Sequence, residues 1–244
     1  MSSTTLFSAV EMAPRDPILG LNEQYNADPN PAKVNLGVGV YFDDQGKLPL
    51  LQCVRAAEQA MMEKPAPRGY LPIDGIAAYD NGVKSLVFGA DSDVVQSGRV
   101  ATVQAIGGTG ALRIGADFLK KVSPNARVLI SDPSWENHRA LFTQAGFTVG
   151  TYRYYDAANR GINFAGFLAD LQAAPAETIV VLHACCHNPT GYDITPAQWD
   201  EVVQVVKSRK LTAFLDMAYQ GFGHGIAEDG AVVGKFVAAG VNFF

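Results

Sequence analysis

From residue 99 onward, the sequence alternates between short apolar runs and longer stretches with helical periodicity, and this alternation constrains the fold most. The apolar runs, which we predict to be strands, cover residues 100–106, 127–131, 147–152, 178–183, 211–215 and 241–244. The helical stretches cover residues 109–121, 135–145, 163–172 and 230–239, and a further helix opens at residue 195. Because parallel strands need a crossover between them, the alternation predicts an α/β fold with a doubly wound, mostly parallel sheet.

Several predicted helices have recognisable start signals. Asn163 can cap the helix that follows it. The segment Thr195-Pro-Ala-Gln198 has the pattern of a capping box with proline at the first helical position. Two more helices are predicted nearer the N-terminus, over residues 16–26 with Asp16 as the cap and over residues 51–64.

The composition excludes several classes of protein. Apolar residues make up 48% and charged residues 18% of the 244 residues, which is typical of a globular chain. The net charge of -5 provides no basic field that would attract nucleic acid or an anionic membrane. We therefore expect no nucleic-acid partner. No window approaches 18 uncharged apolar residues, so we also expect no membrane span.

The cysteines and the N-terminus both favour a cytoplasmic location. Cys53 and the adjacent pair Cys185 and Cys186 make a poor disulfide framework, and we expect Cys185 and Cys186, which follow an apolar run, to be buried, reduced thiols. The first ten residues lack the basic segment and long apolar core of a secretory signal.

In a doubly wound sheet, ligands bind beyond the carboxyl ends of the strands. The run at residues 100–106 is followed by Gly107-Gly-Thr-Gly110 and then by a helix. Glycines allow close backbone approach, the helix N-terminus offers free N–H groups, and Thr109 adds a hydroxyl donor, so this turn is a candidate phosphate cradle. Steric needs alone also produce glycine-rich turns, so the cradle and the steric interpretation both stand.

The next two strand ends carry an indole and an amide. Trp135 follows the run at residues 127–131 and is either a plate for a flat ring or a core anchor. Asn188 precedes a proline after the run at residues 178–183, which favours an extended or turn geometry with the amide available as a donor. A zinc site made by the neighbouring histidines and cysteines is disfavoured, because Cys185 and Cys186 would lie on opposite faces of an extended chain, and we predict no metal.

The run at residues 211–215 ends in an acid. Asp216 is either a helix cap or ion-pair partner, or the partner of a buried cation, and Tyr219 lies three residues further on. Taken together, a phosphate cradle, an aromatic plate, an amide donor, a carboxylate and a phenol suit a phosphorylated, protonated pyridine ring that bears a phenolic oxygen.

These segments also resemble a known family. Gly-Gly-Thr-Gly-Ala-Leu-Arg113, Asp-Pro-Ser-Trp-Glu-Asn-His138, Cys-Cys-His-Asn-Pro-Thr-Gly191 and Asp-Met-Ala-Tyr-Gln-Gly-Phe222 are similar to class I aminotransferases, and most similar to the bacterial aspartate/aromatic branch. Asp16-Pro-Ile-Leu19, residues 35–41 and Tyr70-Leu-Pro-Ile-Asp-Gly75 extend the similarity over essentially the whole chain. The match is to the N-terminal portion of that family.

The resemblance implies a domain division and a cofactor. Residues 1–48 would form an N-terminal arm and the start of a small domain, and residues 49–244 a large cofactor-binding domain that is incomplete at its C-terminal end. The cofactor would be pyridoxal 5'-phosphate. Gly108 and Thr109 would bind its phosphate, and Gly107 would contribute its backbone. Tyr70 would reach the phosphate in the neighbouring subunit, which implies a homodimer with shared active sites.

The resemblance also implies roles around the cofactor ring. Trp135 would stack on the ring, and Asp216 would pair with the ring nitrogen. Asn188 and Tyr219 would bind the phenolic oxygen. Gly39, Trp135 and Asn188 would contact the substrate, and the residues placed behind the carboxylate would be His138 and His183.

The implied activity is transfer of the amino group of aspartate, and of aromatic amino acids, to 2-oxoglutarate. The family also needs a lysine that forms an imine with the cofactor, and it should follow the strand that begins near Val241. We therefore expect the 244-residue polypeptide alone to be inactive.

Two alternatives stand beside this interpretation. One is a truncated, non-catalytic protein that binds the cofactor or a partner. The other is a nucleotide-binding oxidoreductase, which the absence of G-x-G-x-x-G spacing disfavours.

Overall fold

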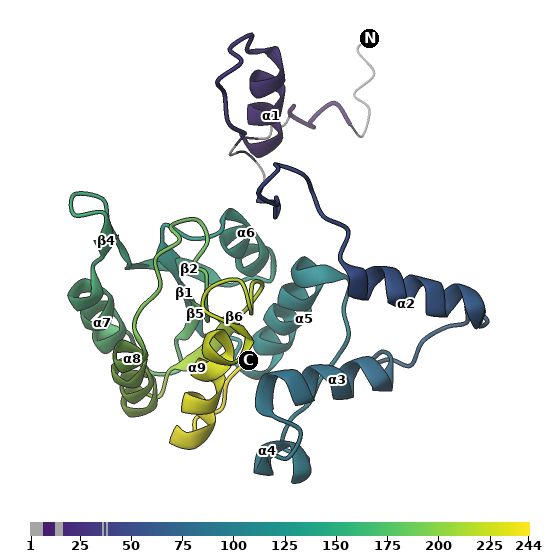
Figure 1. The fold of residues 1–244 in the computed structure, drawn as a ribbon. Coiled ribbons are helices and arrows are strands. Elements are labelled where there is room, and N and C mark those ends of the chain that lie inside the picture. Colours follow the sequence, from purple (N-terminus) through teal and green to yellow (C-terminus); the bar gives the residue numbers. More distant parts are fainter. Residues whose placement is uncertain (1–6, 13–16, 36, 38) are drawn as a thin grey trace, which may run out of the picture. The chain divides into compact units, whose positions relative to one another are not determined.

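The computed structural model describes residues 7–12, 17–35, 37 and 39–244 (Figure 1). The chain divides into two compact units, Met1–Gly69 and Tyr70–Phe244. The division that the sequence analysis places after residue 48 stays a prediction. None of the helices in the described ranges combines the length and apolarity needed to cross a membrane.

The first unit contains α1 (Pro17–Ala27) and α2 (Gln52–Glu63). Both agree with the predicted helices to within one residue at each end, although Asp16, the predicted cap of α1, lies outside the described residues. No residue of α2 is buried.

The second unit contains helices and strands in alternation. Its elements are α3 (Ala77–Phe88), α4 (Asp93–Gln96), α5 (Gly107–Val122), β1 (Arg127–Asp132), α6 (Glu136–Gln144), β2 (Thr148–Arg153), β3 (Tyr155–Asp156), β4 (Gly161–Ile162), α7 (Phe164–Ala173), β5 (Ile179–His183), α8 (Pro196–Arg209), β6 (Thr212–Asp216) and α9 (Ile226–Ala239). Four strands form a sheet in the order β2-β1-β5-β6, and every neighbouring pair is parallel. The predicted α/β fold with a parallel sheet is confirmed.

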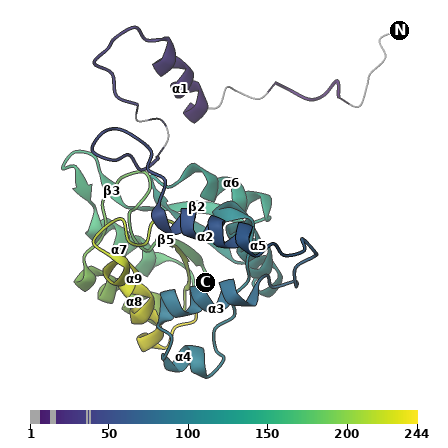
Figure 2. The ribbon, with the colours of Figure 1, turned by 45° about the vertical axis from the view of Figure 1, so that its right-hand side comes forward.

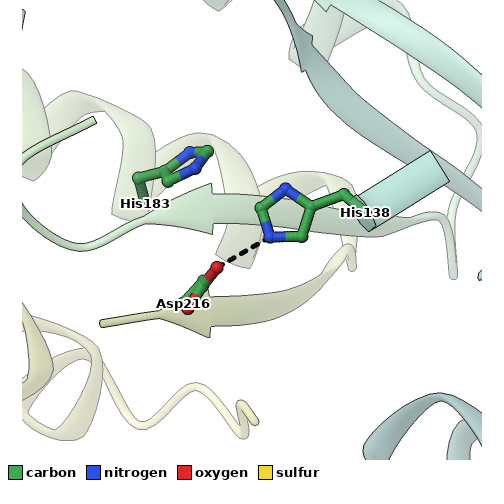
Figure 3. Close-up of side chains that lie close together, drawn as sticks. All are labelled: His138, His183 and Asp216. Carbon is green, nitrogen blue, oxygen red and sulfur yellow. Dashed lines mark hydrogen bonds and ion pairs between the residues drawn. The ribbon is translucent and has the colours of Figure 1, made fainter. Parts of the chain in front are cut away.

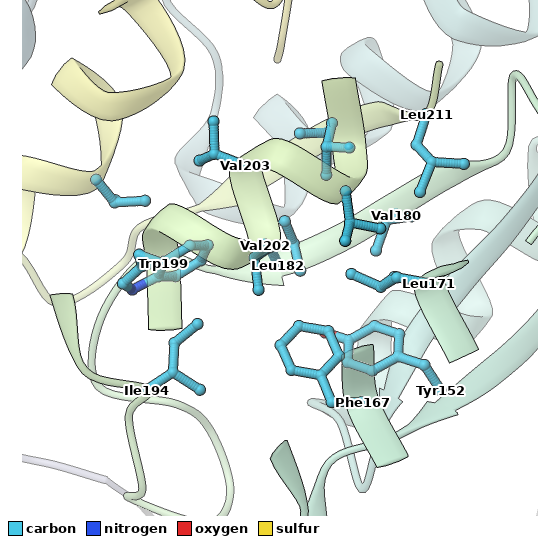
Figure 4. Close-up of a cluster of buried hydrophobic side chains, with 14 of the residues drawn as sticks. Tyr152, Phe167, Leu171, Val180, Leu182, Ile194, Trp199, Val202, Val203 and Leu211 are labelled. Atoms are coloured by element: carbon cyan, nitrogen blue, oxygen red, sulfur yellow. The ribbon is translucent and has the colours of Figure 1, made fainter. Parts of the chain in front are cut away.

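Each face of the sheet has its own hydrophobic core, because successive side chains of a strand point to opposite faces. Val180 and Leu182 of β5 pack in a cluster with residues of α7, α8 and α9 (Figure 4). Ile179 and Val181 of the same strand pack in a second cluster with residues of α5 and α6. Helices accordingly lie on both sides of the sheet (Figure 1, Figure 2).

The predicted start signals of two helices are confirmed by their hydrogen bonds. The side chain of Asn163 accepts from the backbone N–H of Gly166 at 2.9 Å, which caps α7. At the start of α8, the Thr195 hydroxyl accepts from the Gln198 N–H, and the Gln198 side chain accepts from the Thr195 N–H. The start of α9 was predicted four residues too late, since the helix begins at Ile226.

The strand predicted over residues 100–106 is wrong. The Gln104 backbone N–H donates to the carbonyl of Asp74, and the Gln104 side chain accepts from the Ile76 N–H. This stretch therefore pairs with a loop instead of joining the sheet, and Ile106 is left exposed. Its β-type composition is overridden by this tertiary pairing.

The last residues run alongside β6, in agreement with the predicted strand at residues 241–244. Phe243 forms a single parallel bridge with Ala213. The Leu215 N–H donates to the Phe244 carbonyl at 2.7 Å, and the Phe244 N–H donates to the Ala213 carbonyl at 3.0 Å.

Candidate active site

Asp216, the last residue of β6, lies beside His183, the last residue of β5, in the register of the parallel pair. His138 of α6 reaches the same place from the other side, and its Nε2 donates to Oδ2 of Asp216 at 2.7 Å (Figure 3). Nδ1 of His138 lies 2.9 Å from the Ser134 hydroxyl. The His138 side chain is fully buried, whereas that of Asp216 is 18% exposed. His138 therefore fixes one side of the Asp216 carboxylate, and another side remains accessible to a ligand.

His183 adds an imidazole that has no hydrogen-bond partner within the described ranges. Neither of its ring nitrogens is satisfied, although both are buried. Burial, together with the neighbouring rings of His187 and His138, lowers the pKa of His183 to about 3. The ring is therefore neutral at physiological pH and leaves buried polar atoms beside Asp216 that protein groups do not use.

A pocket opens in front of this group of residues. Its lining residues are Gly108, Leu112, Trp135, His183, Cys185, Asn188, Asp216, Ala218 and Tyr219. The predicted Trp135, Asn188, Asp216 and Tyr219, which lie at or just after the ends of the three strands β1, β5 and β6, therefore meet at one place. This arrangement follows from the parallel sheet, whose strands all end at the same edge.

The glycine-rich segment forms the first turn of α5 rather than a loop before it. The helix begins at Gly107, which has a φ of 64°, and Gly108 lines the pocket. A Cβ added at Gly108 would meet no protein atom within 4 Å. The space before the first N–H groups of α5 is therefore open to an anion. Thr109 does not line the pocket, and its hydroxyl accepts from Asn137 of α6 at 3.2 Å.

The loop that carries Tyr219 is anchored by a carboxylate that the sequence analysis did not single out. Asp229 of α9 accepts the backbone N–H groups of Gly221, Gly223 and His224 at 2.8–2.9 Å. These bonds, that of His224 first, lower the pKa of the buried Asp229. Asp229 therefore stays ionised and ties the loop to the start of α9.

The two adjacent cysteines lie on the same side of the chain, contrary to the argument made from the sequence. Cys186 has a φ of 50°, so the backbone there is not extended. Ligand atoms of Cys185, Cys186 and Asp229 lie within 4.8 Å of one another, as do those of His138, His183 and Asp216. Burial raises the pKa of Cys185 to about 12 and also raises the pKa of Cys186, so both remain thiols. The absence of a metal site stays a prediction.

Among the other predicted site residues, Tyr70 and Gly39 also do not line this pocket. Tyr70 is fully exposed at the start of the second unit. Gly39 belongs to the first unit, and its role stays a prediction. The structure also reveals residues that the sequence analysis missed, including Leu112, Cys185 and Ala218 in the lining and Ser134 behind His138. Ser134 lies four residues before His138, a helical spacing that could have signalled the contact.

A parallel sheet whose strand ends bring together a carboxylate, an amide, a phenol and an indole defines an α/β protein that binds a small polar aromatic ligand. Residues 31–243 match the family model described as aminotransferase class I and II. The chain belongs to this family, which confirms the resemblance found in the sequence.

The relatives are aspartate and aromatic aminotransferases. The chain is 63% identical over 240 residues to an aspartate aminotransferase of Pseudomonas aeruginosa, and the match covers 98% of this chain and 60% of the relative. It is 47% identical over 237 residues to an aromatic-amino-acid aminotransferase of Escherichia coli, covering 97% of this chain and 60% of the relative. The chain thus spans about 60% of the length of these relatives.

Solved structures agree with the fold. The aromatic-amino-acid aminotransferase of Burkholderia pseudomallei, covalently bound to pyridoxal phosphate, superposes with a TM-score of 0.95 at 64% identity. That match covers 98% of this chain and 60% of the solved chain. An aromatic amino acid aminotransferase of Psychrobacter sp. B6, cocrystallised with aspartic acid, gives a TM-score of 0.94 at 43% identity and covers the same shares of the two chains.

Proposed function

We propose that this protein is a pyridoxal-phosphate-dependent aminotransferase that moves the amino group of aspartate, and of aromatic amino acids, to 2-oxoglutarate. The observation that carries the proposal is the pair of His138 and Asp216 at the base of a pocket that also holds Trp135, Asn188 and Tyr219. The names of the relatives support both substrate classes.

The residues present suit the cofactor. A partly buried carboxylate is costly unless a cation or donors neutralise it, and a protonated pyridine nitrogen would supply that partner on the open side of Asp216. The open N-terminus of α5 at Gly108 suits a phosphate. The Asn188 amide and the Tyr219 hydroxyl are donors suited to a phenolic oxygen.

When bound, pyridoxal phosphate supplies an electron sink for the α-carbon of an amino acid. Asp216 holds a proton on the ring nitrogen, and that proton deepens the sink. His138 keeps the carboxylate pointed at the ring, because Ser134 and the buried surroundings fix the imidazole. Trp135 orients the ring by stacking, and Asn188 and Tyr219 stabilise negative charge on the phenolic oxygen.

Other parts of the proposal rest on the family resemblance. Gly107 and Thr109 help to bind the phosphate, and Gly39 lies over the substrate carboxylate. Tyr70 reaches the site of a second subunit in a cytoplasmic homodimer, and the complete exposure of its side chain within its own unit supports that role.

Lysine is absent from the residues that line this pocket. We therefore propose that the 244 residues alone bind the cofactor without a covalent link and do not catalyse transfer. The test is borohydride treatment of this polypeptide with pyridoxal phosphate, followed by mass spectrometry of the digested protein. A specific lysine adduct would refute this proposal.

The activity itself is tested on the full native protein by measuring glutamate formed from 2-oxoglutarate with aspartate or phenylalanine as donor. We expect activity with both donors, and the Asn188→Ala variant should lose most of it. Asp156→Asn, in the hairpin of β3 and β4, is the matched control and should keep it. A native mass near the 26.0 kDa of this chain, with no glutamate formed, would favour the non-catalytic alternative.

A further inference from the structure

The short loop between β5 and α8 carries Asn188, and an unusual backbone conformation precedes it. Cys186 has a φ of 50°, in the left-handed region that side chains other than glycine rarely adopt. Such a conformation persists only when the surroundings enforce it, and it recurs at functional sites. The structure must therefore contain groups that hold Cys186 in place.

Asp193 is the group that holds this backbone. Its Oδ2 accepts the N–H of Cys186 at 2.6 Å, and its Oδ1 accepts the N–H of His187 at 2.8 Å. The two backbone N–H groups immediately before Asn188 therefore both donate to one carboxylate. The Gly191 N–H closes the loop on the far side of Asn188 by donating to the His187 carbonyl at 2.7 Å.

The position of Asp193 is fixed by the two residues that follow it. Ile194, the next residue, is buried in the core beside Trp199 and Val202 (Figure 4). Thr195 follows with the capping box that starts α8. Asp193 is exposed, but its backbone is fixed by the buried Ile194 and by the start of α8. Its carboxylate can therefore hold the loop in one position.

We propose that Asp193 is a positioning residue that aims the Asn188 amide into the pocket by clamping the two backbone N–H groups that precede it. A carboxylate suits this task because it offers two charged acceptors on one planar group, whereas an asparagine offers a single acceptor oxygen. The inference rests on the proposed function, because it assumes that the Asn188 amide binds the phenolic oxygen of the cofactor.

The test compares Asp193→Ala and Asp193→Asn in the full native protein loaded with pyridoxal phosphate. The readout is the pH midpoint of the visible absorbance of the bound cofactor, because a donor to the phenolic oxygen lowers that midpoint. We expect Asp193→Ala to raise the midpoint by about 1 unit, with a smaller rise for Asp193→Asn. Asp156→Asn is the matched control, since Asp156 also accepts two backbone N–H groups, those of Ala158 and Asn159, but these belong to the turn of the β3–β4 hairpin and not to the loop of Asn188.

Two further variants separate positioning from a purely structural role. In an Asn188→Ala background, Asp193→Ala should leave the midpoint unchanged, because the group that it positions is gone. Cys186→Gly should partly restore the midpoint of Asp193→Ala, because glycine adopts the left-handed conformation without the clamp. A variant that melts earlier but keeps the wild-type midpoint would overturn the inference.

A crystal structure of Asp193→Ala without cofactor tests the inference independently of the proposed function. We expect Cys186 to leave the left-handed region and the Asn188 side chain to turn out of the pocket. An unchanged loop would refute the inference, whether or not the wild-type protein binds pyridoxal phosphate. A wild-type protein that binds no cofactor, combined with a displaced loop in the variant, would refute the proposed function and leave the clamp supported.

Discussion

The imidazole of His187 is stacked on the phenol ring of Tyr154, with 4.0 Å between the ring centroids and 15° between the ring planes. Nε2 of His187 lies 2.9 Å from the Ser131 hydroxyl, and Nδ1 lies 2.8 Å from the Thr190 hydroxyl. Both ring nitrogens of His187 are therefore hydrogen-bonded, and this neutral ring lies next to Asn188 in the chain. Burial, aided by the neighbouring His138, lowers the pKa of His187 to about 4.

This stacked histidine predicts an acid sensitivity. An unfolded histidine takes up a proton near pH 6.5, whereas folded His187 stays neutral until about pH 4. The unfolded state therefore binds more protons, and stability falls as the pH drops through that window by about 1.4 kcal/mol per pH unit. In urea unfolding at several pH values, His187→Asn should lose that slope. The exposed His224→Asn is the control, and equal slopes in wild type and His187→Asn would contradict the prediction.

The capping box of α8 predicts a modest loss of stability. Thr195→Ala removes the acceptor for the Gln198 N–H and should cost about 1 kcal/mol, whereas Thr195→Ser should cost much less because it keeps the hydroxyl. Chemical denaturation of the two variants measures the difference. A loss for serine equal to that for alanine would show that the methyl group, and not the hydrogen bond, matters at this position.

The core on the α5 and α6 face of the sheet predicts a larger loss. Phe142 is fully buried and contacts Phe147 and Phe214, so Phe142→Ala should cost about 3–5 kcal/mol. Phe118, on α5, is 52% exposed and serves as the matched control. Its alanine variant should unfold at a denaturant concentration much closer to that of the wild type. Similar midpoints for the two variants would contradict the predicted core.

The carboxylate at the base of the pocket predicts a large loss of function. Asp216→Asn keeps the size of the side chain but removes the charge that would pair with a protonated ring nitrogen. Under the proposed function, amino transfer by the full native protein should fall by about 10²-fold or more. Asp200→Asn, which alters the surface pair of Asp200 and Lys235, is the control. An asparagine variant with wild-type kcat would contradict the role of Asp216.

Local signals in the sequence predicted much of the fold. The capping residues Asn163 and Thr195 act within one helical turn, so neighbouring residues suffice to reveal them. The buried strands β1, β5 and β6 were recognisable because both faces of the sheet are covered and each strand has an unbroken apolar run at its centre. Signals of these kinds were missing or misleading elsewhere. Helices α3 and α4 and the hairpin of β3 and β4 were not predicted, and residues 100–106 were assigned to a strand.

The sequence alone predicted the alternation of the four sheet strands β1, β2, β5 and β6 with helices α5 to α9. It also placed Trp135, Asn188, Asp216 and Tyr219 just after strands, because these features depend on local pattern and on the single edge that parallel strands share. The groups that hold the loops of Asn188 and Tyr219 in place became visible only in the folded structure. The family resemblance already implied His138 behind Asp216, whereas Asp193 and Asp229, which no motif indicated, act on backbone N–H groups. Every residue except proline has a backbone N–H, so the residue type does not show which of these groups binds a carboxylate. Contacts of this kind are set by three-dimensional packing.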